Sequence, residues 1–289
     1  MTTQDRTRHS ERARVQETMG IAAFLRSRRA ALDPGAVGLP PAPNPRRVPG
    51  LRREEVAQLA GISVDYYIRI EQGRAQGISG SVLDAVARAL RLNDDERAYL
   101  RNMAAPPGTQ PGTAPVVRPE IQRLLDAMGE AVPAFVVGPG LDYLAWNPLG
   151  ARLAFDVAAL PPERRNAALL VFLHPGSRAL HPDWDRVAAE TAAALRSEAG
   201  RHPCHPRVKG VVAELLAESA EFRALWEDQE VRETMSGRKL IRHPEAGDLD
   251  VAYETFRLAT DDTQTLCTYT ADPGSPTETA LRRLAAAEA

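Results

Sequence analysis

Arginine residues are concentrated at the N-terminal end of this sequence of 289 residues. Residues 1–53 hold 11 arginines against 4 acidic residues, and residues 1–105 carry a net charge of +5. The whole chain has a net charge of −2, so the remainder carries −7. A basic end joined to an acidic body indicates that only the basic end contacts a polyanion such as a nucleic acid. The alternative is that these arginines are ordinary surface charges.

Histidine, cysteine and serine residues are the other candidates for chemistry. The segment RHPCHP offers His202, Cys204 and His205 as metal ligands, but no second cluster has the spacing of a zinc site. The segment PGSP lacks the Gly-x-Ser-x-Gly pattern of a nucleophilic serine, and no glycine-rich phosphate loop occurs. We therefore expect no metal, no cofactor and no catalytic site. The two cysteines do not form a disulfide framework, which favours a reducing cytoplasm.

The stretch GLRREEVAQLAGISVDYYIRIEQGR, residues 50–74, predicts two short helices joined by a tight bend at Gly61. Ser63 can cap the second helix by accepting the backbone N–H of Tyr66, and Gly73 can end that helix. A short helix, a glycine-containing bend and a second short helix are typical of a DNA-binding helix-turn-helix.

The surrounding sequence supplies the elements that would position this stretch. Its apolar spacing predicts five helices, over residues 20–32, 52–60, 64–72, 81–90 and 94–103. Six prolines between residues 33 and 50 make that segment a long loop. We interpret residues 1–19 as a mobile arm, 20–105 as a DNA-binding domain and 106–117, rich in Pro, Gly and Thr, as a linker.

Residues 20–92 resemble the lambda-repressor-like (Xre-type) helix-turn-helix family through REEVAQLAGISVDYYIRIEQGR. The resemblance implies that residues 64–72 form a recognition helix in the major groove, with Tyr67 and Ile70 facing the core. It also implies that Arg29 pairs with Glu71 and holds that helix in register. The candidate DNA-binding residues are Arg46, Arg47, Arg52, Arg53, Ser63, Val64, Asp65, Tyr66, Arg69 and Arg74.

Two of these positions depart from the amide side chains that are common in the family. Val64 can only contact a thymine methyl group, and Asp65 can accept a hydrogen bond from a cytosine amino group. Direct base contacts are therefore expected from Tyr66, Arg69 and the loop residues Arg46 and Arg47. The two loop arginines contact phosphate or the minor groove, or else are solvated loop charges.

The second half of the sequence changes character. The segment AFVVGPGLDYLAWN predicts a strand, a turn and a second strand. A helical region follows over residues 148–231, and then RKLIRHP, DLDVAYETFRL and TLCTYTA predict three more strands. In the second of these, Leu249, Val251, Tyr253, Thr255 and Arg257 share one face. Hairpins at both ends with helices between them predict an α+β domain with an antiparallel sheet.

Several segments of this half resemble the MmyB-like transcription regulators, which join an Xre-type domain to a PAS-like sensor domain. They are DYLAWNPLGARLAF, RRNAALLVFL, HPDW, GRKLIRHPEAG and YTADPGSP, and the resemblance covers nearly the whole chain. It implies a ligand-binding domain over residues 118–289 that takes a small apolar molecule, fatty-acid-like in some members.

The candidate ligand-binding residues are Phe135, Leu144, Trp146, Asn147, Arg165, Phe172, Trp184, Trp226, Arg242, His243 and Tyr253. An arginine at the mouth of a pocket could bind a ligand carboxylate bidentately. Structural roles are the alternatives: the large side chains would form the core, Asn147 would cap a helix before Pro148, and Arg165 would pair with a nearby acid.

The expected fold class is α+β. An N-terminal all-α, five-helix, lambda-repressor-like helix-turn-helix domain would precede a C-terminal PAS-like antiparallel-sheet domain with helices. No run of about 18 apolar residues occurs, so we expect a cytoplasmic protein without a membrane partner. The expected function is a transcription regulator, not an enzyme, that binds double-stranded DNA as a homodimer and senses a small apolar effector. The alternative is a ligand-independent DNA-binding regulator whose C-terminal domain recruits a protein partner.

Overall fold

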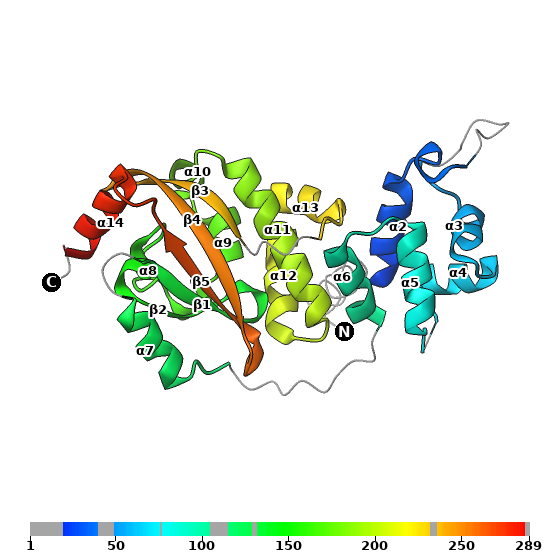
Figure 1. The fold of residues 1–289 in the computed structure, drawn as a ribbon, viewed down its shortest axis with the longest axis horizontal. Coiled ribbons are helices and arrows are strands. Elements are labelled where there is room, and N and C mark those ends of the chain that lie inside the picture. Colours follow the sequence, from blue (N-terminus) through cyan, green and yellow to red (C-terminus); the bar gives the residue numbers. More distant parts are fainter. Residues whose placement is uncertain are drawn as a thin grey trace, which may run out of the picture.

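The structure is a computed structural model that describes residues 20–39, 49–75, 77–104, 115–128, 132–231 and 236–286. The predicted arm over residues 1–19, most of the predicted linker, and the loop arginines Arg46 and Arg47 lie outside these ranges. The described chain forms an N-terminal helical region followed by an α+β region with one antiparallel sheet (Figure 1).

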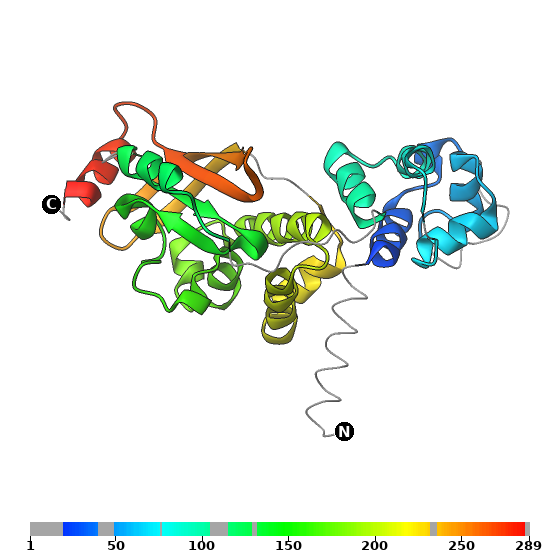
Figure 2. The same cartoon turned by 90° about the horizontal axis from the view of Figure 1, so that it is seen from below.

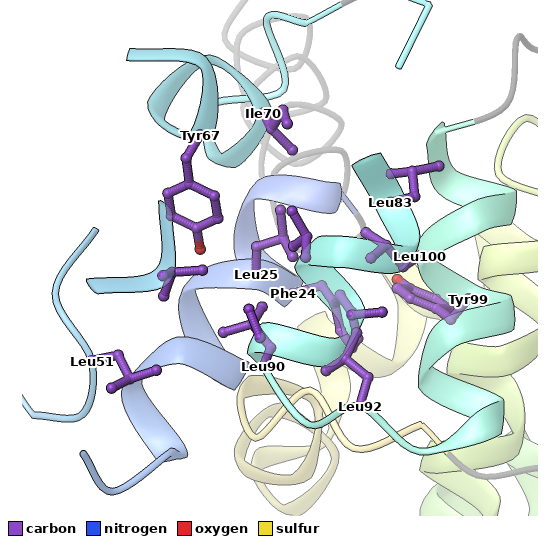
Figure 3. Close-up of a cluster of buried hydrophobic side chains, with 14 of the residues drawn as sticks. Phe24, Leu25, Leu51, Tyr67, Ile70, Leu83, Leu90, Leu92, Tyr99 and Leu100 are labelled. Carbon is purple, nitrogen blue, oxygen red and sulfur yellow. The ribbon is translucent and has the colours of Figure 1, made fainter. Parts of the chain in front are cut away.

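Five α-helices occur in the described residues of the N-terminal region, close to the ranges that the sequence predicts. They are α2 (Ile21–Ala31), α3 (Arg53–Ala60), α4 (Val64–Glu71), α5 (Gly80–Ala89) and α6 (Asp94–Ala104), with a short 3-10 helix at Gly35–Val37. Figure 3 shows the side chains that join them, among them Phe24 from α2, Tyr67 and Ile70 from α4 and Tyr99 from α6. The predicted inward positions of Tyr67 and Ile70 are confirmed, because both side chains are fully buried.

In the described residues of the C-terminal region, a run of helices separates two strands from three later strands. Its strands are β1 (Ala134–Val137), β2 (Tyr143–Trp146), β3 (Ser236–His243), β4 (Gly247–Leu258) and β5 (Asp261–Thr270). Its α-helices are α7 (Pro119–Ala127), α8 (Pro148–Arg152), α9 (Ala167–Leu173), α10 (Ser177–Leu180), α11 (Trp184–Arg201), α12 (Pro206–Glu218), α13 (Ala220–Glu227) and α14 (Pro276–Ala286). Short 3-10 helices occur at Pro139–Leu141 and Pro162–Arg164.

The sheet has the strand order β2-β1-β5-β4-β3, and all neighbouring strands are antiparallel. Residues far apart in sequence are neighbours in it, because β1 pairs with β5 and places Phe135 opposite Cys267. Tyr253 lies opposite Tyr269 in the β4–β5 pair. The two predicted hairpin regions therefore form one continuous sheet.

Different helices cover the two faces of this sheet. Ile121 and Leu125, four residues apart on α7, pack with Val136 and Leu266 on one face. The opposite face is directed toward α8 to α11 (Figure 1). The five strands and the helical region between them were predicted from the sequence. Helices α7 and α14 were not.

A layer of helices lies between the sheet and the N-terminal helices (Figures 1 and 2). It consists of α11, α12 and α13, whose buried side chains include Leu195, Val212, Phe222 and Trp226. The longest of these helices is α11; it contacts α6, and it lines a cavity together with strands of the sheet. This helical layer connects the two parts of the molecule.

Candidate functional sites

The bend between α3 and α4 forms as the sequence predicts. Gly61 ends α3 with φ of 66°, a left-handed conformation that glycine adopts without strain, and its N–H donates to the carbonyl groups of Ala57 and Gln58. The Ser63 hydroxyl accepts the backbone N–H of Tyr66 at 3.2 Å and caps α4. The start and direction of α4 are therefore fixed by local hydrogen bonds.

Helix α4 carries four of the ten residues predicted to contact DNA, and three of them lie on its exposed face. Val64, Asp65 and Arg69 are exposed, whereas Tyr66 is half-buried and packs partly against the domain core. The predicted residues that flank this face and are also exposed are Arg52, Ser63 and Arg74. Ser63 and Arg74 flank the two ends of α4, whereas Arg52 precedes α3. Their contact with DNA stays a prediction, as does that of Arg46 and Arg47.

A buried carboxylate holds α4 against α2 and α3. Glu71 is fully buried, and Arg29 on α2 donates from Nε and Nη2 at 3.1 and 3.2 Å, which confirms the predicted pair. Arg29 also donates from Nη1 to the carbonyl group of Leu51 at 2.7 Å. Two guanidinium hydrogen bonds in a fork geometry fix direction as well as distance, so this pair sets the register of α4.

Arg53 has a role that the sequence analysis did not predict. Its Nε and Nη2 atoms donate to Oε1 of Glu71 at 3.1 and 3.0 Å. These hydrogen bonds raise the pKa of the Arg53 guanidinium. Arg53 was predicted to contact phosphate, but two of its donor atoms are engaged within the domain, so it supports the helix-turn-helix from inside. A phosphate contact through its remaining nitrogen stays a prediction.

A cavity of about 230 Å³ lies between the sheet and the helices α8 to α11. The sheet contributes side chains from its inner face, including Phe135, Lys239, Tyr253 and Cys267. The helical wall is a stripe along α11, with lining residues at Val187, Glu190, Thr191, Ala194, Ser197, Glu198 and Arg201. Steps of three and four residues place these side chains on one face of a helix.

Burial changes the acid–base properties of several cavity residues. It lowers the pKa of His181 to about 4, with a smaller contribution from the charge of Lys239. Burial raises the pKa of the Cys267 thiol to about 12 and raises that of Tyr269 as well. It also lowers the pKa of Lys239, an effect that the nearby charge of Glu190 opposes. The imidazole and the thiol are therefore neutral near pH 7, which suits a cavity for an apolar molecule.

Two of the eleven candidate ligand-binding residues, Phe135 and Tyr253, line this cavity. The other nine, which lie elsewhere in the α+β region, are Leu144, Trp146, Asn147, Arg165, Phe172, Trp184, Trp226, Arg242 and His243. Phe172, Trp184 and Trp226 pack within the helical layer, and Leu144 packs near α7. Large aromatic side chains were thus a poor guide to the cavity, because most of them form core contacts.

The polar candidates have structural partners. Asn147 caps α8 by accepting the N–H of Gly150 at 2.7 Å, as its alternative interpretation predicted. Arg165 forms no ion pair with an acid in the described part of the chain: it donates to the carbonyl groups of Leu160 and Ala158, and it lies over the ring of Trp146 at 5.2 Å. The two remaining polar candidates have partners of their own.

Arg242 is exposed and donates to Asp248 at 3.2 Å. The Nδ1 atom of His243 accepts the N–H groups of Glu245 and Ala246 in the β3–β4 turn. Neither side chain lines the cavity, whose lining includes the cations Arg201, Lys239 and Arg257. Binding of a ligand carboxylate by an arginine stays a prediction.

The cavity residues that sequence reasoning missed include Tyr143, Phe155, His181 and Lys239. The alternation in β4 correctly grouped Tyr253, Thr255 and Arg257, and the same alternation in β5 would have grouped Thr265, Cys267 and Tyr269. The stripe on α11 mixes charged and small residues, so it gave no apolar signal. Within the described ranges, no group of three His, Cys, Asp or Glu side chains could hold a metal ion.

The face of α11 that turns away from the cavity contacts α6. Arg196 is almost fully buried, stacks on the Trp226 ring at 3.7 Å and hydrogen-bonds to the Tyr99 hydroxyl group. Gly200 lies against the Tyr99 ring so closely that a Cβ atom there would overlap with it. Tyr99 in turn packs on Phe24 of α2, with ring centroids 4.9 Å apart (Figure 3). The cavity wall and the N-terminal core thus share one helix contact.

A second contact joins the two regions nearby. Arg28 on α2 donates to the carbonyl oxygen of Asp228 at the end of α13 and forms an ion pair with Glu96 of α6 at 2.7 Å. The Ser27 hydroxyl donates to the same Asp228 carbonyl at 3.2 Å. The helix that carries Arg29 is therefore attached directly to the helical layer.

Two family models match the chain. The model described as the MmyB-like transcription regulator ligand binding domain matches residues 117–284. The model described as a helix-turn-helix domain matches residues 21–100. No curated protein matches the chain. No helix in the described part of the chain is long and apolar enough to cross a membrane.

Proposed function

The chain belongs to the MmyB-like transcription regulators, and we propose that a small apolar molecule in its cavity sets the affinity of the α4 face for an operator. A helix-turn-helix domain and a ligand-binding domain make it a DNA-binding transcription regulator with a small-molecule effector. The observation that carries the finer proposal is the position of α11. One face of this helix lines the cavity, and its opposite face contacts α6.

The size and walls of the cavity favour an apolar effector. A cavity of roughly 150 Å³ lined by apolar side chains holds a benzene molecule. The cavity here measures about 230 Å³, and Phe135, Leu153 and Phe155 are among its walls. An effector somewhat larger than benzene would fit and would bury most of its surface, which is the main source of affinity for apolar ligands.

A continuous set of contacts leads from the cavity to α4. Arg196 and Gly200 of α11 contact Tyr99, and Tyr99 packs on Phe24 of α2. The same helix α2 carries Arg29, which holds Glu71 of α4. An effector that fits one placement of α11 better than another would shift the placement of α4, since a ligand changes an equilibrium only through its different affinity for the two states.

In this proposed function, the protein binds its operator as a homodimer and catalyses no reaction. One helix-turn-helix unit contacts too few bases for strong specificity, whereas two units would read an inverted repeat with half-sites one helical turn, or a small multiple of it, apart. Such a protein would act in the cytoplasm. Sequencing the DNA fragments that the full-length protein retains would give the symmetry and spacing of the operator.

A thermal-shift screen of the full-length protein with apolar metabolites tests the effector. Ala194 lies in the α11 wall, so Ala194→Phe fills part of the cavity without introducing charge. We expect at least one compound to raise the melting temperature of the wild type and not that of the variant, because only ligand bound to the native state stabilises it. If no compound does so, the alternative function, recruitment of a protein partner by the C-terminal region, would be favoured instead.

A further inference from the structure

The two carboxylates of the cavity lie at different points of the α11 stripe. Glu198 pairs with Arg201. Arg257 also lines the cavity and is exposed, so it lies at the cavity's opening. Glu190 lies eight residues before Glu198 on the same helix, which corresponds to about 12 Å along its axis. One small polar group on a ligand can therefore contact Glu190 or Glu198 but not both.

Three polar groups that line the cavity with Glu190 lack a hydrogen-bond partner among the described residues. One is Oε2 of Glu190 itself, since Arg186 binds the other carboxylate oxygen at 2.7 Å. The second is Nδ1 of His181, a side chain that is only 5% exposed. The third is the ammonium group of Lys239, which donates no hydrogen bond to a described residue. Buried polar atoms without a partner are unfavourable until a ligand or water supplies one.

These three groups lie near one another. His181 follows α10, which packs against β3, the strand that carries Lys239. Burial lowers the pKa of His181 to about 4, and the charge of Lys239 contributes to that shift. Burial also lowers the pKa of Lys239, and the charge of Glu190 opposes this effect. Because charges influence each other strongly only at short range, Lys239 lies close to both. No ion pair within 4.0 Å joins Lys239 to Glu190, so space remains between them.

We propose that this part of the cavity recognises a hydroxyl group on the effector, which donates its proton to Oε2 of Glu190 and accepts hydrogen bonds from Lys239 and from Nδ1 of His181. A hydroxyl group has one donor and two acceptor lone pairs, so it satisfies all three groups at once. The neutral imidazole carries its proton on Nδ1 in one of its two tautomers. This inference rests on the proposed function and makes the effector an apolar alcohol or phenol.

Other polar groups fit this arrangement less well. A carboxylate on the ligand would place a second negative charge beside Glu190, and an ammonium group would place a second positive charge beside Lys239. A methyl group would leave all three protein groups without a partner. Oε2 of Glu198 is also without a partner, but it lies too far along α11 to share the same hydroxyl group. A neutral group that both donates and accepts is therefore favoured.

Three matched ligands test this selection on the full-length protein. Isothermal titration calorimetry would compare 4-ethylphenol, 4-ethyltoluene and 4-ethylbenzoate, which differ only in the group opposite the ethyl substituent. We expect 4-ethylphenol to bind at least about tenfold more tightly than either of the others, because a site built to hydrogen-bond a hydroxyl group rejects analogues that lack it. Equal binding of 4-ethylphenol and 4-ethyltoluene would overturn the inference and leave the apolar effector in place. Tighter binding of 4-ethylbenzoate would overturn it as well.

Two variants assign the preference to the charged side chains. Lys239→Met keeps an unbranched apolar stem and should reduce the preference for 4-ethylphenol over 4-ethyltoluene by at least about fivefold. Glu190→Gln keeps the shape of the side chain and should reduce it by at least about threefold, because a hydrogen bond to a neutral acceptor is weaker. The two variants should act in opposite directions on 4-ethylbenzoate: Glu190→Gln removes a repulsion and strengthens its binding, whereas Lys239→Met removes an attraction and weakens it.

Matched controls and a folding check complete the experiment. Arg242→Met and Asp185→Asn alter exposed residues outside the cavity, on β3 and on α11, and should leave the preference unchanged. Circular dichroism would show whether each variant folds, and Glu190→Gln decides if Lys239→Met does not fold. An unchanged preference in the folded variants would overturn the assignment to Glu190 and Lys239. If none of the three ligands binds to the wild type, both this inference and the apolar effector fail.

Discussion

The two candidate sites each contain a charged side chain, and they differ in how many hydrogen bonds that side chain forms. In the helix-turn-helix domain, the buried Glu71 carboxylate receives hydrogen bonds from two arginines, Arg29 and Arg53. In the cavity, the Lys239 side chain is half-buried and donates no hydrogen bond to a described residue; its Nζ atom lies 5.0 Å from the centre of the Tyr253 ring. The first site is completed by the protein itself and holds α4 in one orientation. In the proposed function, the second site is completed by a ligand.

The two sites also differ in how far apart their residues are in the sequence. The exposed face of α4 and its flanking residues come from within 25 consecutive positions, Gly50–Arg74. The cavity draws on residues from Phe135 to Tyr269, brought together by the β1–β5 pairing and by α11. Changes in the first site should therefore act on stability and DNA binding together, whereas changes in the second should act on ligand response.

The largest effect is expected from Glu71→Ala. Removing one member of a buried, hydrogen-bonded charge group leaves the others without compensation and destabilises a protein by about 3–5 kcal/mol. Urea unfolding should show this loss, and operator binding should be lost with it. Glu54→Ala is the control, because Glu54 is an exposed acid on the adjacent helix α3. Equal stability of the two variants would mean that Glu71 is not the centre of this site.

The stability of the folded protein should depend on pH through His181, which lines the cavity. Its pKa is about 4 in the folded protein against 6.5 for the unperturbed side chain. The unfolded state therefore binds more protons between these values, so stability present above pH 6.5 is lost as the pH falls toward 4, by about 3 kcal/mol. Unfolding measured across this range should show a weaker pH dependence for His181→Leu than for wild type. Identical slopes would show that the imidazole is not buried in its neutral form.

Arg69→Ala tests the DNA-facing surface without disturbing its support. The side chain is exposed on α4 and should contribute about 1–3 kcal/mol to operator affinity if it contacts a base. Fluorescence anisotropy with operator DNA would measure the loss, while the melting temperature should stay the same. Arg88→Ala, at an exposed arginine of α5, provides the control. A similar loss in both variants would indicate a general charge effect in place of recognition.

The smallest expected effect is on the salt dependence of operator binding, and it distinguishes the role of Arg52 from that of Arg53. Arg52 is exposed, and Arg52→Ala should lower the slope of log K against log salt concentration by about 0.9 if it neutralises one phosphate. Arg53→Ala should instead lower stability, because Arg53 holds Glu71. Salt titrations of operator binding measure the first effect and urea unfolding the second. An unchanged slope for Arg52→Ala would remove it from the DNA-binding surface.

Local signals in the sequence predicted the helix-turn-helix correctly. The cap at Ser63 and the bend at Gly61 depend on neighbours within a few residues, whereas the inward positions of Tyr67 and Ile70 came from the resemblance to a family. The bonds of Arg53 to Glu71 were missed because they depend on how α3 packs against α4. The resemblance to a family supplied the Arg29–Glu71 pair, which spacing alone would not have given.

Only some of the residues that line the cavity could be predicted from the sequence. Alternation in β4 grouped Tyr253 with Thr255 and Arg257, and these residues line the cavity, as does Phe135 from the first strand; contact of Phe135 and Tyr253 with a ligand stays a prediction. Lys239 and His181 were missed, because their positions depend on the pairing of β3 and on the contact of α10 with that strand. Trp184 and Trp226 were chosen for their size, and they pack in the helical layer. Tertiary packing decides which of several large side chains faces a cavity.

The central claim is that the cavity and the α4 face are coupled through α11 and α6. The ratio of operator dissociation constants with and without a saturating cavity ligand tests it most directly, in wild type and in Tyr99→Leu, which removes the ring that contacts Gly200 and Arg196. We predict that the ligand changes the operator dissociation constant of the wild type by a factor of about 5 to 150, the range of typical coupling energies. In Tyr99→Leu, the ratio should be close to one although the ligand still binds with the same affinity. An operator affinity that the ligand leaves unchanged in the wild type, or the same ratio in both proteins, would contradict it.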